Sequence, residues 1–446
     1  MKIPGLSLAL SCLVVTSCNK SEKQPIDKSG VTTKSNRPDP RAVVLAPHEG
    51  DGRIDKQIRQ VQDQIRSGQA ASRTVEQLGW LYVAKARETF DAGYYKLAEQ
   101  CALCREQDNP GAPECLFLRG HVLHNLHQFR KAEMLANELV AKRGMPVDFG
   151  LLGDSLMEQG KLEAAVTAYQ RMADLKPDLH VFVRAAHVRW LKGDLAGALE
   201  LAESAARSIS LRDADTAAWV LTRLAFYEFQ AGAVDAARVA CDQALTFRPD
   251  YPPMLLLRGR MLLAETNAGE AVPILRRAAK LVPLPEYEWA LAEALEMSGE
   301  RSEALSVESE LCLTGAATDP RTLALFLATR GQDSQQALRL AQEELENRGD
   351  VFTQDALAWA LAGAGRIDEA RTHSAQALVE GTQDARLFFH AAILASRAGD
   401  DLEAAKWIAK ASGLKAMLLP SERQQLLRLS TTQFPTQSSG LAGMEK

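Results

Sequence analysis

The sequence is short of the residues that build β-sheets. Aromatic residues make up only 6% of its 446 positions, and β-branched residues are scarce beside alanine, leucine, glutamate, glutamine and arginine. This balance favours helices over strands. A large excess of charge of one sign is also missing, because the formal net charge is only −5. The chain therefore has no overall basic field that would attract nucleic acid or an anionic membrane surface.

Long apolar runs and catalytic motifs are absent as well. Beyond the N-terminus, no apolar run reaches the roughly 18 residues that a bilayer-spanning helix needs. The sequence contains no P-loop, no G-x-S-x-G or H-E-x-x-H motif and no glycine-rich dinucleotide turn. These absences predict a protein that is not an enzyme and holds no cofactor.

Cysteine and histidine occur in small groups without the spacing of a metal site. Cys101 and Cys104 form a C-x-x-C inside a predicted helix, with Cys115 nearby. Buried thiols and a disulfide from Cys115 to one of the pair both remain open. Three histidines fall within two turns of the next predicted helix: His121, His124 and His127. Without carboxylates or thiols at ligand spacing they predict no metal site.

The N-terminus reads as a targeting segment. Met1–Lys2 precedes an apolar stretch, Ile3–Val15, which ends in Val-Thr-Ser-Cys at Cys18. This resembles the bacterial lipoprotein signal, which implies that residues 1–17 are removed and that the Cys18 thiol carries a lipid. A cleaved secretory signal and a cytoplasmic N-terminus are the alternatives. The resemblance implies an extracytoplasmic protein anchored to a bacterial membrane through this lipid only. The outer membrane is favoured, because Asn19 rather than aspartate follows.

Residues 18–52 are rich in Lys, Ser, Pro, Asp and Gly and show no helical period. This composition predicts a disordered tether between the lipid and the folded body. A short apolar patch, Ala42–Leu45, offers the alternative that part of the tether docks on the body. The serine- and glutamine-rich residues 431–446 are predicted to be a disordered tail.

The body contains an internal repeat, marked by alanines that recur at intervals of 33 or 34 residues with a single interval of 39. Twelve positions before each alanine stands a small residue in nine copies of ten, and five positions before it stands glycine in seven. Small residues let two helices pack closely, and glycine ends the first helix of a pair. The ten alanines are Ala98, Ala132, Ala165, Ala198, Ala237, Ala271, Ala304, Ala337, Ala370 and Ala404.

This pattern resembles the tetratricopeptide repeat. The segment GDSLMEQGKLEAAVTAYQRMADLKP at Gly153–Pro177 follows that motif's order of small residue, glycine, alanine, aromatic residue and proline. The resemblance covers Leu78 to Leu414 and implies an all-α, right-handed α-solenoid of about ten helix pairs. With capping helices at Ile54–Ser67 and from Pro420, the solenoid is expected over residues 53–430.

In the tetratricopeptide family the first helices line a concave groove that binds extended or helical protein segments. Projecting the alanine register onto this family geometry places twelve of the nineteen Trp and Phe residues on groove-facing lines. Packing between helices is the alternative role for these side chains. The predicted groove residues are Trp80, Phe90, Phe117, His121, Asp154, His187, Trp190, Trp219, Phe226, Phe229, Arg260, Trp289, Glu293, Phe326, Phe352, Trp359 and Phe389.

The resemblance implies a non-catalytic scaffold that binds a segment of an envelope or secreted protein in this groove. Trp and Phe are typical of binding hot spots, which fits that expectation. Two alternatives remain: a small-molecule or glycan-binding protein that uses the same groove, and a structural solenoid that associates with itself. The sequence does not identify the partner or the pathway.

Overall fold

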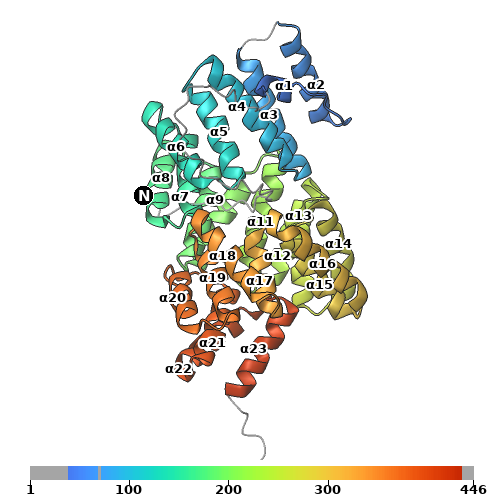
Figure 1. Ribbon diagram of the computed structural model, residues 1–446, viewed down its shortest axis with the longest axis vertical. Coiled ribbons are helices and arrows are strands. Elements are labelled where there is room, and N and C mark those ends of the chain that lie inside the picture. Colours follow the sequence, from blue (N-terminus) through green and yellow to red (C-terminus); the bar gives the residue numbers. More distant parts are fainter. Residues whose placement is uncertain (1–38, 69–71, 434–446) are drawn as a thin grey trace, which may run out of the picture. The chain divides into compact units, whose positions relative to one another are not determined.

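The computed structural model of the protein describes residues 39–68 and 72–433, and every regular element in these ranges is helical (Figure 1). These residues fall into two compact units, divided between Lys176 and Pro177 except that Ala317–Asp319 group with the N-terminal unit. The predicted signal peptide, Cys18 and the tether up to residue 38 lie outside the described residues, as does the tail beyond residue 433. None of the described helices combines the length and apolar character needed to cross a bilayer.

The N-terminal unit contains a leading helix of 5 residues, a second of 14 residues and three helix pairs. Its elements are α1 (Pro40–Val44), α2 (Arg53–Arg66), α3 (Ser72–Thr89), α4 (Gly93–Asp108), α5 (Pro113–Asn125), α6 (Phe129–Lys142), α7 (Pro146–Glu158) and α8 (Leu162–Leu175).

The C-terminal unit contains seven further pairs and a final segment. Its elements are α9 (Leu179–Leu191), α10 (Leu195–Arg207), α11 (Ala214–Gln230), α12 (Val234–Phe247), α13 (Pro252–Ala264), α14 (Ala268–Leu281), α15 (Pro285–Ser298), α16 (Arg301–Thr318), α17 (Pro320–Arg330), α18 (Ser334–Asn347), α19 (Val351–Gly363), α20 (Ile367–Ala377), α21 (Ala385–Arg397), α22 (Asp401–Gly413), the 3-10 turn η1 (Lys415–Met417) and α23 (Pro420–Gln433).

The helix pairs confirm the predicted all-α solenoid of about ten repeats. Each of the ten repeat alanines lies in the second helix of a pair, and each is at most 1% exposed. The small residue twelve positions earlier is what permits the close packing. At Gly153, an added Cβ would lie 2.2 Å from the ring of Tyr169 on the second helix of the same pair.

Local sequence sets where the helices begin. Eight helices of the C-terminal unit start behind an Asp or Asn whose side chain accepts a backbone N–H of the first turn, which satisfies a donor that the helix itself leaves unpaired. These residues are Asp178, Asp194, Asp213, Asn267, Asp333, Asp350, Asp384 and Asp400. The 39-residue interval corresponds to a loop after Arg207 and to a longer first helix, α11, of 17 residues.

The segment 39–52 differs from its prediction as a disordered tether. Val44 is buried, and its carbonyl accepts hydrogen bonds from the Gln62 side chain at 2.8 Å and from the Tyr82 hydroxyl at 3.0 Å. Asp55 binds both Lys85 and His48. Burial alone would raise the pKa of Asp55, but these hydrogen bonds outweigh it and lower that pKa to about 2. The apolar patch therefore docks on the body, together with the predicted cap α2.

Within the C-terminal unit the first helix pair meets a much later part of the chain. The Thr382 hydroxyl donates to the Leu191 carbonyl at 2.7 Å, and Lys192 lies 3.3 Å from Glu380. Gly193 approaches the Gly381 carbonyl so closely that an added Cβ would lie 2.7 Å from that oxygen. The repeats of this unit therefore close on themselves, because the loop after α20 packs on the end of α9.

Candidate functional site

In the C-terminal unit, the predicted groove aromatics lie on first helices as expected, but six of them are buried. Trp289 is only 1% exposed, and its ring meets Phe326 edge-on with centroids 5.6 Å apart. The prediction of an open groove is therefore wrong for these six side chains, because they fill the spaces between neighbouring first helices. The buried residues are Trp190, Phe229, Trp289, Phe326, Trp359 and Phe389.

Contacts between repeats explain this burial. Trp190 stacks on Phe352 with centroids 5.7 Å apart and meets Phe226 edge-on at 5.3 Å. Phe352 belongs to α19, so this stack is part of the closure described above. Trp359 donates its Nε1 proton to the Thr329 hydroxyl at 3.0 Å and stacks on His390 at 4.0 Å. Phe226, Phe352 and the remaining predicted aromatic of this unit, Trp219, keep partial exposure.

Arginines cover the outer sides of several rings. Arg386 lies over Trp289 at 5.0 Å from the ring centroid, Arg330 over Phe326 at 5.7 Å and Arg397 over Trp359 at 5.9 Å. A guanidinium over an aromatic face is favourable and also keeps solvent from the ring. Arg330 and Arg397 were not among the predicted groove residues.

Two predicted polar residues are buried among these rings. His187 contacts Arg223, whose guanidinium lies 2.6 Å from the histidine Nδ1. Burial, followed by repulsion from Arg223, holds the pKa of His187 well below its usual value. Glu293 accepts a hydrogen bond from the Trp289 Nε1 at 3.2 Å and lies 3.6 Å from Arg330. Both side chains therefore already have interaction partners within the protein.

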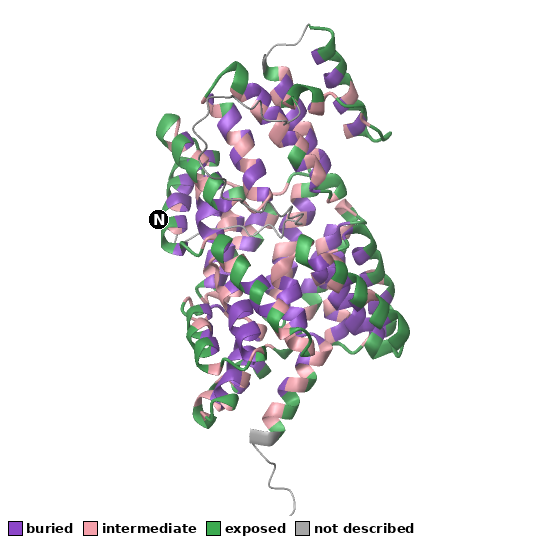
Figure 2. Cartoon of the chain, viewed as in Figure 1, coloured by how far each residue is buried: buried purple, intermediate pink, exposed green. Residues whose placement is uncertain are grey.

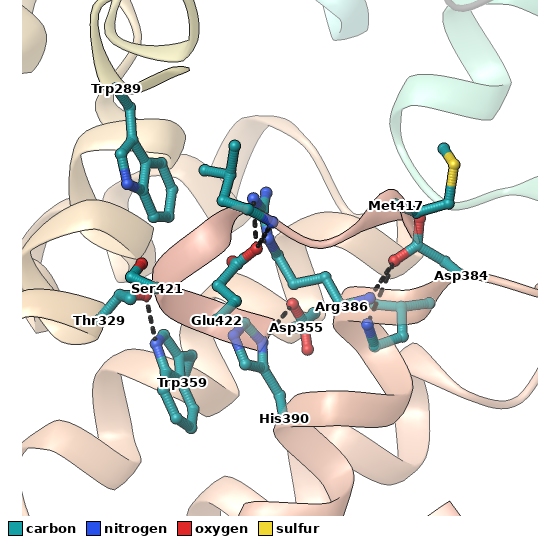
Figure 3. A network of polar contacts seen from close by, with 12 residues as sticks. Trp289, Thr329, Asp355, Trp359, Asp384, Arg386, His390, Met417, Ser421 and Glu422 are labelled. Carbon is teal, nitrogen blue, oxygen red and sulfur yellow. Dashed lines mark hydrogen bonds and ion pairs between the residues drawn. The ribbon is translucent and has the colours of Figure 1, made fainter. Parts of the chain in front are cut away.

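The final segment of the chain packs on the same first-helix face (Figure 3). Arg260, a predicted groove residue, donates to the Met417 carbonyl at 2.7 Å. The Ser421 backbone N–H and its hydroxyl both donate to Glu293. Arg386 binds the Glu422 carboxylate at 2.7 Å. Sequence reasoning assigned α23 to capping and missed Ser421 and Glu422 as groove contacts.

The N-terminal unit has a different arrangement, because its predicted groove aromatics stay partly exposed. Trp80 on α3 lies 5.5 Å from Phe117 on α5 and 5.5 Å from His121, one turn further along α5. We call these three residues the aromatic patch. Arg143 lies over Phe117 at 5.5 Å, and Arg87 contacts the His121 Nε2 at 3.0 Å. The structure therefore brings three predicted groove residues together on one face, flanked by arginines.

Two further predicted residues of this unit are Asp154 and Phe90. Asp154 is buried and accepts a hydrogen bond from the Tyr169 hydroxyl at 2.8 Å, which gives it a packing role. Phe90 is half-buried at the end of the first pair's first helix, where its φ is 58°. Its left-handed backbone marks the turn between α3 and α4.

Among the residues that the structure describes, the cysteines and histidines form no recognisable reaction centre. Cys101, Cys104 and Cys115 are buried free thiols, and burial raises the pKa of each. A thiol whose pKa is raised is a poor nucleophile at neutral pH. Within the described ranges, no three His, Cys, Asp or Glu side chains are grouped so as to hold a metal ion.

Comparisons with known proteins agree with the repeat architecture. Residues 149–179 match the family model of the tetratricopeptide repeat, which confirms the repeat at the copy quoted from the sequence. A search of curated proteins gives no significant match.

Several solved structures resemble the chain in fold. One is a tetratricopeptide repeat protein from Parabacteroides merdae, with 15% identity over 57% of this chain and 98% of that chain and a TM-score of 0.32. Another is the C-terminal part of a repeat protein from Cytophaga hutchinsonii, with 16% identity over 62% and 99% and a TM-score of 0.33. A third is the human IFIT1 dimer with PPP-AAAA, with 15% identity over 84% and 94% and a TM-score of 0.46. At these identities the likeness concerns the fold alone.

Proposed function

We propose that this protein is a non-catalytic interaction scaffold and that its aromatic patch binds an extended or helical segment of a protein partner. The observation that carries the proposal is the contrast between the two units. Predicted groove aromatics are mostly buried in the C-terminal unit, whereas Trp80, Phe117 and His121 remain together and partly exposed. Repeats of this type generally mediate binding, and clustered Trp and Phe are the side chains that most often anchor a partner.

The chemistry of the patch indicates the kind of segment that fits. Two aromatic rings offer apolar surface, while Arg143 is already paired with Asp148, whose carboxylate lies 2.8 Å away. A segment with one or two large apolar side chains would bury the rings without breaking this pair. Such a contact would gain free energy mainly from the apolar area removed from water.

A peptide array tests this proposal directly. Trp80→Ala and Phe117→Ala are expected to reduce binding of captured peptides at least tenfold, with unchanged helical circular dichroism. The matched control is Trp407→Ala, because Trp407 is equally half-buried but lies on the second helix α22, stacked on Phe388. Equal peptide binding by all three variants would remove the function from the patch. Binding to glycan arrays instead of peptides would support the small-molecule alternative.

We also propose that the protein is attached outside the cytoplasm by a lipid on Cys18. The support is the sequence pattern around Cys18, where an apolar core ends in small residues before the cysteine. Metabolic labelling with a fatty-acid analogue should mark the wild-type protein and leave Cys18→Ser unlabelled. Labelling of both forms, or of neither, would contradict the anchor.

A further inference from the structure

The last segment of the chain, residues 414–433, is buried at several positions up to Leu426 and at none from Leu427 to Thr431. Met417, Leu418, Leu419 and Leu426 are buried, whereas no residue from Leu427 to Thr431 is buried and Leu427 is 65% exposed. Most of α23 is intermediate or exposed in Figure 2. The segment is therefore anchored by a short apolar stretch and by the first turns of α23, and the remainder of the helix adds little contact.

The beginning of α23 is recognised through its free backbone donors. A helix leaves the N–H groups of its first turn unpaired, and these carry partial positive charge. The Ser421 N–H donates to Glu293 of α15 at 2.9 Å, and the Ser421 hydroxyl donates to the same carboxylate. Glu293 is only 1% exposed. A buried carboxylate on a different helix thus completes the first turn of α23.

Glu422 provides the second contact and is fully buried. One of its oxygens accepts the Leu419 N–H at 2.8 Å, which caps α23, and the other binds Arg386 of α21 at 2.7 Å. A fork of guanidinium nitrogens facing a carboxylate is a directional contact that other side chains do not reproduce. Arg386 therefore reads an acidic residue at the third position of the bound helix.

Two further arginines fix the chain direction. Arg260 of α13 donates to the Met417 carbonyl at 2.7 Å, just before the helix begins. In the opposite sense, Arg423 of α23 donates to the Ala264 carbonyl at 3.1 Å and also to the Leu263 carbonyl, both at the C-terminal end of α13. A negative helix end facing an arginine is a favourable arrangement.

These contacts exceed what capping requires. A cap has to cover the apolar side of α22, whereas the contacts above come from α13, α15 and α21 and recognise particular groups. We propose that Arg260, Glu293 and Arg386 form a segment-binding site and that residues 414–433 are its resident, exchangeable ligand. The partner is a protein segment of the same chemistry: two or three apolar residues followed by a helix that begins Pro-Ser-Glu or an equivalent hydroxyl and acidic pair. This site is separate from the aromatic patch, so the two proposals stand or fall independently.

The test uses the full chain and a fluorescein-labelled peptide of residues 414–433, followed by fluorescence anisotropy. The wild-type chain should bind the peptide weakly, because its own segment competes. Glu422→Arg in the chain places two positive groups face to face and should free the site, so that the wild-type peptide binds at least tenfold more tightly. Arg386→Glu in the chain should reject the wild-type peptide and accept a peptide with Glu422→Arg. Non-specific peptide binding would not produce this reversal of specificity.

Circular dichroism and hydrogen exchange cover the case in which a single variant is unstable. The double variant Arg386→Glu/Glu422→Arg restores opposite charges and should fold with its segment docked. In the wild-type chain, amides of residues 420–426 should exchange faster than those of α22. Exchange of both only through global unfolding, or no peptide binding by folded variants, would overturn the proposal. A wild-type dimer that exchanges these segments would assign the site to a second copy and overturn the separate partner.

Discussion

The carboxylate of Glu422 on α23 lies 2.7 Å from the guanidinium of Arg386 on α21, 36 residues earlier in the chain. Glu422 has no exposed surface, so its charge is stabilised by the protein and not by water. Burial alone would raise the pKa of Glu422, but Arg386 and the Leu419 N–H outweigh it and lower that pKa. The docked state of the last helix depends on this balance.

Arg386→Met should destabilise the protein strongly, because it leaves the buried Glu422 charge without its partner. We expect a loss of about 3 kcal/mol in the free energy of unfolding, measured by urea denaturation. The matched control is Arg371→Met, which breaks an exposed ion pair with Asp400 and should cost at most about 1 kcal/mol. Similar losses in both variants would show that burial of Glu422 adds nothing.

The same ion pair predicts detachment of α23 in acid. Since the pKa of Glu422 is lower in the folded state, its contribution is fully present above the ordinary glutamate range. It is lost as pH falls through the lowered folded pKa. Hydrogen exchange followed from pH 6 towards pH 3 should show earlier loss of protection in residues 420–426 than in α21. The opposite order would contradict a carboxylate-held contact.

Glu288 on α15 predicts the reverse pH dependence. It is buried, its Oε2 has no hydrogen-bond partner among the described residues, and burial raises its pKa to about 7. Its folded pKa exceeds its unfolded one, so the protein should lose stability as pH rises from about 4.5 to 7. Glu288→Gln should therefore be near neutral at pH 5 and stabilising by about 2 kcal/mol at pH 8. Exposed Glu200, changed to Gln, serves as the control and should show no such trend.

Gly153 offers a test of how much stability depends on close packing within a helix pair. An alanine there would place its Cβ 2.2 Å from the Tyr169 ring, which is itself fixed by burial and by its hydrogen bond to Asp154. Gly153→Ala should cost about 1–3 kcal/mol, read as a shift in the urea midpoint. Gly269→Ala is the control, because it lies in α14 with open space around it and should stabilise by about 0.5–1 kcal/mol.

Thr266 carries backbone strain that glycine would relieve. It occupies the turn position of its repeat with φ 62°, where other copies have glycine, and its side chain is exposed. β-Branched residues avoid this region, so Thr266→Gly should stabilise the protein by about 1 kcal/mol. Gly299→Ala, at φ 90° in the equivalent turn of the next repeat, should destabilise by a similar amount. Thermal unfolding of the two variants should move in opposite directions, and movement in the same direction would contradict the strain.

The repeat register was predictable because it is a local property. Ala304 and the equivalent alanines lie where the two helices of a pair approach closely. Their spacing can therefore be recognised in this one sequence. Two of the three copies without glycine keep the register, since His127 and Thr266 take the left-handed conformation at the expected turn, whereas in the third the positive φ falls on Gly331 and Asp333 beside Gln332. The ten helix pairs follow from this local information.

The fate of the groove aromatics was not predictable in the same way. Trp190 is buried by Phe352 and by the closure of the C-terminal unit, and both depend on how small rotations accumulate over several repeats. The residue spacing in the sequence does not reveal this accumulated rotation between repeats. The docking of Val44 was only an alternative and the contact of Glu422 was missed for a related reason, because each lies in a short segment whose docking surface is built by distant residues.

Closure of the C-terminal unit has a consequence for how this unit unfolds under mechanical force. In an open array each repeat touches only its neighbours, so under tension the repeats unfold one after another from the end, each in a small step. Here the hydroxyl of Thr382 holds the carbonyl of Leu191, and the Trp190 ring lies on Phe352. The terminal pair α9–α10 is thus fastened at two places along the chain. Tension applied between α9 and α22 would act on these two contacts first. The unit would then unfold cooperatively in a single event.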